Sequence, residues 1–140
     1  MNLKEKIVLK FDDVNQYLTE LEDILPETEE EYKTNLTRRR ACEKTIELAI
    51  EGIIDVMAML VSHLKLGVPQ NEDDIIKILE KKKVLSPTLA ARIREMKGFR
   101  NILVHKYGNI DDSKAYSSLQ EELEDFSLFE KEIKNYLKKR

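Results

Sequence analysis

The chain has 140 residues, 36% of them charged and 41% hydrophobic, with only 4 Gly and 3 Pro, so we expect one domain over residues 1–140 with a single core. The lone Cys42 excludes a disulfide framework and favours a reducing, cytoplasmic location. The charged start, residues 1–6, argues against a secretory signal, and the most apolar window, residues 52–64, is too short to span a membrane.

The first predicted element covers residues 3–24, where apolar side chains recur at every third or fourth position. Pro26 closes this amphipathic helix. Thr28 and Glu31 then have the spacing of a capping box, which opens a second helical stretch whose apolar stripe continues to residue 64.

The second stretch would be about 55 Å long if it were one helix, so we expect a kink or a break before the basic run at residues 38–40. Its apolar surface is wider than one neighbour covers, which predicts either a central position in a bundle or contact with another subunit. The residues that widen it are Leu48, Ile54, Val56 and Val61. Glu43, Glu47, Glu51 and Asp55 form an acidic row at every fourth position. We interpret this row as an exposed helix edge, with support of a functional site as the minor alternative.

Three further helices complete the prediction. Asn71 with Asp74 caps a short one, Ser86-Pro87 starts the next, and Asp111-Asp112 precedes the last. No segment has the period of a strand, so the expected fold is all-α, an up-and-down bundle of four to five helices.

Candidate chemistry gathers in residues 100–107, which contain Arg100, Asn101, His105 and Tyr107. Arginine stays charged and binds phosphate oxygens, and histidine transfers protons near neutral pH. On a helix Asn101 and His105 share a face, whereas Arg100 and His105 point roughly 140° apart. Arg100 and His105 could also simply complement the negative end of the helix dipole.

The pattern Arg100-Asn101, His105 and Tyr107 resembles the R-x4-H-x-Y signature of the HepT-like branch of the HEPN superfamily. The stretch from Arg40 to Asp55 resembles the long central helix of that family, and the similarity covers roughly residues 3–137. The resemblance implies a HEPN-like helical bundle.

The resemblance also implies a function, that of a metal-independent endoribonuclease acting as the toxin of a type VII (HEPN-MNT) toxin-antitoxin system. Catalysis would fall to Arg100, which stabilises phosphoryl charge, Asn101, which orients a phosphate or the imidazole, and His105, which is general base or acid for attack by the RNA 2′-hydroxyl. The implied partners are an RNA substrate, a second copy of the chain in a homodimer, and a minimal nucleotidyltransferase antitoxin with which higher hetero-oligomers form. That antitoxin would neutralise the toxin by AMPylation of Tyr107. No cofactor, metal ion or membrane is implied.

Two alternatives remain open at this stage. Tyr107 could be a ring packed at a helix end, with its hydroxyl exposed. The whole domain could be a non-catalytic adaptor that binds a nucleotidyltransferase and retains the motif for structure alone.

Charge distribution favours a phosphate-bearing partner in spite of the net charge of −3. Residues 77–106 contain nine basic and two acidic residues, a local charge of +7 against −10 for the rest. Arg92, Lys97 and Lys106 are therefore candidates for contacts with the RNA backbone. A carboxylate-bridged metal site would need Glu three residues before each His, and those positions hold Leu60 and Ile102.

Overall fold

The computed structural model describes residues 1–105 and 110–140, and all regular structure in these ranges is helical. The helices are α1 (Leu3–Ile24), α2 (Glu29–Thr34), α3 (Leu36–His63), α4 (Glu72–Lys81), α5 (Pro87–His105) and α6 (Asp112–Lys138). The all-α prediction is confirmed, but these ranges contain six helices where four to five were expected, because Asn35 separates α2 from α3. Within the described ranges, no helix is both long and apolar enough to cross a membrane.

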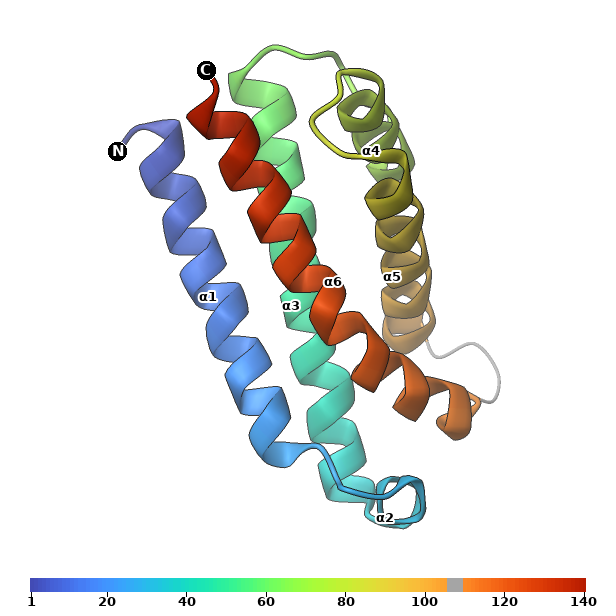
Figure 1. Cartoon of the computed structure of the whole chain (residues 1–140). Coiled ribbons are helices and arrows are strands. Elements are labelled where there is room, and N and C mark those ends of the chain that lie inside the picture. The colour runs from blue at the N-terminus through green and yellow to red at the C-terminus, as the bar shows by residue number, and fades with distance from the viewer. Residues whose placement is uncertain (106–109) are drawn as a thin grey trace.

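The long helices α1, α3 and α6 lie side by side, and α5 flanks them on one side (Figure 1). The short helix α4 runs antiparallel to α5, since its first residue, Glu72, contacts Arg100 while Glu80, near its end, contacts Arg94. The α4–α5 connection lies at one end of the bundle, and the last turn of α5 lies near the other end (Figure 1). The two ends of α5 therefore face different parts of the surface.

Local capping explains where the helices begin. Thr28 Oγ accepts a hydrogen bond from the Glu31 amide at 3.2 Å, as the capping-box spacing predicts. The expected break before residues 38–40 falls at Asn35, which ends α2 and caps α3 by accepting from the Arg38 amide at 3.0 Å. Asn71 caps α4 in the same way, accepting from the Asp74 amide at 2.9 Å.

Helix α3 is the centre of the bundle and packs against α1, α2, α4 and α5. Ile54, Val56 and Val61 are buried and Leu48 is half-buried, so most of the wide apolar surface is covered within one chain. At Gly52 the contact between α3 and α1 is so close that a Cβ would lie 2.5 Å from Val14 Cγ2. Glycine therefore sets the spacing of these two helices.

The acidic row on α3 corrects one sequence interpretation. Asp55 is exposed, but Glu43 is only 5% exposed and pairs with Arg40 at 2.9 Å. The four acidic residues lie along one side of α3, but part of that side is buried. The row therefore forms an exposed edge only in part. Cys42 is also buried, and burial raises the pKa of its thiol to about 11.

Candidate active site

Helix α5 carries the candidate residues and is anchored to α6 at its first turn. The Ser86 amide and hydroxyl both donate to the Glu132 carboxylate at 2.8 Å, and Ser86 Oγ accepts from the Leu89 amide at 3.2 Å. Pro87 is the first residue of the helix. Proline has no amide hydrogen, but an amide hydrogen at this position would have no partner within the helix. Five buried residues along α5 then fix its rotation in the bundle, namely Leu89, Ala90, Ile93, Met96 and Leu103.

Arg100 lies between three helices. Its side chain is 12% exposed, its Nη2 donates to Glu72 Oε1 on α4, and its Nη1 is 3.9 Å from Glu51 Oε1 on α3. Its Nε is buried and has no hydrogen-bond partner among the described residues. Two carboxylates thus orient a guanidinium that remains charged at any working pH.

Asn101 and His105 lie on another side of α5. Asn101 is half-buried and His105, the last residue of the helix, is exposed. Arg100 points toward α4. The side chains of Arg100 and His105 are therefore separated around the helix within one chain, as helix geometry predicts. Lys106 and Tyr107 lie outside the described residues, so their predicted roles are untested.

The two proposed backbone-binding residues on α5 make ion pairs. Arg92 donates to Asp125 at 2.9 Å, and Lys97 donates to Asp73 at 2.7 Å. The hydrogen bond from Lys97 lowers the pKa of Asp73 from its ordinary value. Arg92 keeps a half-exposed side chain, whereas that of Lys97 is only 16% exposed. Arg92 is therefore the more accessible of the two.

Sequence reasoning did not identify Glu72 as a partner of Arg100, and it treated Glu51 only as a minor possibility. Glu72 follows the α4 cap, so its sequence context indicates helix-dipole complementarity and nothing more. Its contact with Arg100 spans 28 positions and depends on the antiparallel packing of α4 on α5. Only the excess of acids in the first turn of α4 opposite a basic α5 could have suggested it.

The arrangement combines a permanent cation, a half-buried amide and an exposed imidazole on the last two turns of one helix. Such groups can bind a phosphate and move a proton. Over residues 1–105 and 110–140, no group of three or more His, Cys, Asp or Glu side chains is placed to hold a metal ion.

Comparison with known families assigns the chain. The family model described as "Ribonuclease HepT-like" matches residues 14–133. The chain belongs to the HepT-like ribonuclease family. The expected family resemblance is thereby confirmed, although the match does not test the individual motif residues.

Members of the family with curated names are similar over most of their length. The tRNA nuclease HepT of Aphanizomenon flos-aquae is 27% identical over 124 residues, which cover 89% of this chain and 84% of that protein. The mRNA nuclease HepT of Shewanella oneidensis is 26% identical over 99 residues, covering 71% of this chain and 74% of that protein.

Two solved structures share the fold. The tri-AMPylated Shewanella oneidensis HEPN toxin, in complex with its MNT antitoxin, superposes with a TM-score of 0.88 at 24% identity, covering 96% of this chain and 99% of that one. The cytosolic protein YutE of Bacillus subtilis gives a TM-score of 0.81 at 21% identity, covering 97% of this chain and 91% of that one. The HEPN-like bundle predicted from the sequence is confirmed.

Proposed function

We propose that this chain is a metal-independent endoribonuclease that acts as the toxin of a HEPN-MNT toxin-antitoxin pair, with Arg100, Asn101 and His105 as its catalytic residues. The observation that carries the proposal is the placement of these three side chains on the last two turns of α5 in a HepT-like ribonuclease. The curated relatives named as tRNA and mRNA nucleases support RNA as the substrate.

The proposed reaction is transesterification within the RNA. The ribose 2′-oxygen forms a bond to the adjacent phosphorus, and the bond from phosphorus to the 5′-oxygen of the next nucleotide breaks. His105 takes the 2′-hydroxyl proton or gives a proton to the leaving 5′-oxygen, and Arg100 stabilises the charge on the phosphoryl oxygens. Asn101 orients the phosphate or the imidazole. The products carry a 2′,3′-cyclic phosphate and a 5′-hydroxyl.

A homodimer would bring together the groups that one chain holds apart. Ile102 and Val104, on the same turns of α5 as the motif, are 52% and 45% exposed. Covering them with a second copy would place the Arg100 of one subunit near the His105 of the other. Sedimentation should then give twice the chain mass of 16.4 kDa, and a monomer with full activity would contradict this arrangement.

Cleavage of RNA by the purified protein is the direct test. We expect cyclic-phosphate products in the presence of a metal chelator and no cleavage of a DNA copy, because DNA lacks the attacking hydroxyl. His105→Ala should lower the rate at least about a hundredfold. His63→Ala is the matched control, because His63 ends α3 and its Nδ1 is 3.1 Å from the Met59 carbonyl oxygen.

The second candidate function is a non-catalytic adaptor, and the ion pairs of Arg100 favour it, since they give this residue a structural role. Equal RNA cleavage by the wild type and His105→Ala, or no cleavage by either, would support the adaptor and refute the ribonuclease.

Neutralisation is proposed to occur through a minimal nucleotidyltransferase that transfers AMP from ATP to the Tyr107 hydroxyl, with release of pyrophosphate. The added charge and bulk would occupy the place of the substrate phosphate. The Shewanella oneidensis HEPN toxin, which is tri-AMPylated in its complex with the MNT antitoxin, supports this mechanism. Tyr107→Phe should remain toxic when the antitoxin is co-expressed, and survival of those cells would contradict the proposal.

A further inference from the structure

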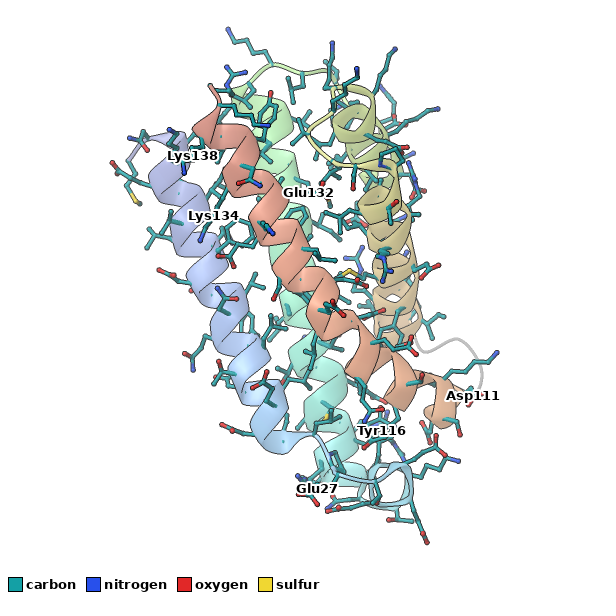
Figure 2. All side chains as sticks on the ribbon, viewed as in Figure 1. Glu27, Asp111, Tyr116, Glu132, Lys134 and Lys138 are labelled. Atoms are coloured by element: carbon teal, nitrogen blue, oxygen red, sulfur yellow. The ribbon has the colours of Figure 1, made fainter. Side chains whose placement is uncertain are left out.

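A basic cavity lies at the end of α5 opposite the candidate catalytic residues. Its volume is about 900 Å³, and it is formed by the end of α4, the α4–α5 connection and the last turns of α6. Glu132 lies toward this end of α6, whereas Asp111, which precedes α6, lies at the other end of the molecule (Figure 2). The cavity is therefore separate from Arg100 and His105.

Five cations and two carboxylates line the cavity, and both carboxylates are already engaged. Glu80 accepts from Arg94 at 2.9 Å, and Glu132 accepts from Ser86. The other four cations make no ion pair with any residue that the structure describes; they are Lys77, Lys81, Lys83 and Lys139. The cavity lining therefore carries a net positive charge, with five cations against two carboxylates.

One lysine in this group is held in an unfavourable backbone conformation. Lys83 has a φ of 61°, in the left-handed region that favours glycine. Its ammonium group is exposed at the cavity, in the turn between α4 and α5. Lysine therefore costs this turn some stability relative to glycine.

A surface stripe connects the cavity to the candidate catalytic residues. Asn101 and His105 follow Arg94 by seven and eleven positions, which places each of them within about 20° of Arg94 around α5. Gly98 lies between them, and no atom is within 4 Å of the position that its Cβ would occupy. The stripe therefore has an open midpoint where a polymer backbone can approach the helix.

We propose that this cavity binds the phosphodiester backbone of the RNA substrate several nucleotides away from the bond that is cut. Arg94 and His105 are about 16 Å apart along the helix axis, a distance that the backbone of a few nucleotides can span. The proposal rests on the proposed ribonuclease function for its substrate, but binding can be measured without cleavage.

The test removes three cavity charges in the variant Lys77→Gln/Lys81→Gln/Lys83→Gln. Its affinity for a non-cleavable 2′-O-methyl RNA of about ten nucleotides should fall at least about tenfold, and the slope of log K against log salt should decrease by about 2. Cleavage of a dinucleotide should not change, because it is too short to reach the cavity.

A matched control variant loses the same number of charges outside the cavity. Lys4→Gln/Lys131→Gln/Lys134→Gln should keep the affinity and the salt slope of the wild type. Equal losses in the two triple variants would show a general charge effect and overturn the proposal. An unchanged affinity in the cavity variant would overturn it too.

Two further measurements distinguish an RNA site from a site for ATP or for the antitoxin. If the cavity variant keeps RNA binding but loses binding of ATP or of the antitoxin, the site belongs to those ligands and the proposal is wrong. If it binds RNA weakly but cleaves the dinucleotide normally, the cavity is a substrate site even where the catalytic assignment of His105 fails.

The variant Lys83→Gly guards against loss of folding, because it should raise the melting temperature while weakening RNA binding. Lys65→Gly is its control, since Lys65 has a φ of 53° and does not line the cavity. It should also raise the melting temperature but leave RNA binding unchanged. Equal RNA binding by both glycine variants would remove Lys83 from the proposed site.

Discussion

Replacing Glu122 with glutamine should stabilise the protein, and the gain should grow as the pH rises. Glu122 on α6 is 8% exposed, and its Oε2 has no hydrogen-bond partner among the described residues. Burial raises the pKa of this carboxyl from 4.5 to about 8, and the neighbouring carboxylates Asp125, Glu95 and Glu121 add to the increase. At neutral pH the folded chain therefore holds Glu122 mostly protonated.

The expected size follows from the pKa difference between the folded and unfolded states. A pKa raised from 4.5 to about 8 corresponds to at most about 5 kcal/mol of folding free energy at ~1.4 kcal/mol per unit. Because the folded-state pKa is raised, this contribution is fully present below pH 4.5 and is lost as the pH rises through about 8. The variant Glu122→Gln has no charge to bury and escapes this loss.

Urea unfolding between about pH 5 and about pH 8 measures the effect. The stability of Glu122→Gln relative to the wild type should increase by several kcal/mol across this interval. Glu124→Gln, which changes an exposed carboxylate on the same helix, should show no such trend. A constant difference between Glu122→Gln and the wild type at every pH would refute the reasoning, because Glu122 would then titrate alike in the folded and unfolded chains.

Two pairs of matched variants test the packing. Gly52→Ala should destabilise the protein by about 1–3 kcal/mol in thermal unfolding, because the new methyl group meets α1. Gly98→Ala should stabilise it by about 0.5–1 kcal/mol, because alanine is the better helix former and its methyl group has open space. Equal effects of the two variants would refute the close contact between α3 and α1. Tyr116→Phe should cost about 1–2 kcal/mol, because it removes the 2.6 Å hydrogen bond to the Pro26 carbonyl oxygen. Tyr32→Phe should cost nothing, since the buried Tyr32 hydroxyl has no partner in the described ranges, and a loss as large as that of Tyr116→Phe would contradict this account.

Glu132 shows how far local sequence signals reach. The start of α5 at Ser86-Pro87 was predictable, because a cap and a first-turn proline act within a few residues. The hydrogen bonds from Ser86 to Glu132 on α6 were not predictable, because the two residues are 46 positions apart. The same limit applies to Glu122, whose α6 position gives no sign that its carboxyl is buried.

The sequence by itself determined the helices, their caps, the break near the basic run of α3 and the resemblance of residues 100–107 to the family signature. These features depend on contacts between residues three or four positions apart, and such contacts can be counted along the chain. Only the tertiary structure decided that Glu72 and Glu51 hold Arg100 and that cations from α4, from α5 and from the segments that follow α4 and α6 line one cavity. Those contacts depend on how the helices are rotated against one another, and that rotation is set by the packing of the whole core.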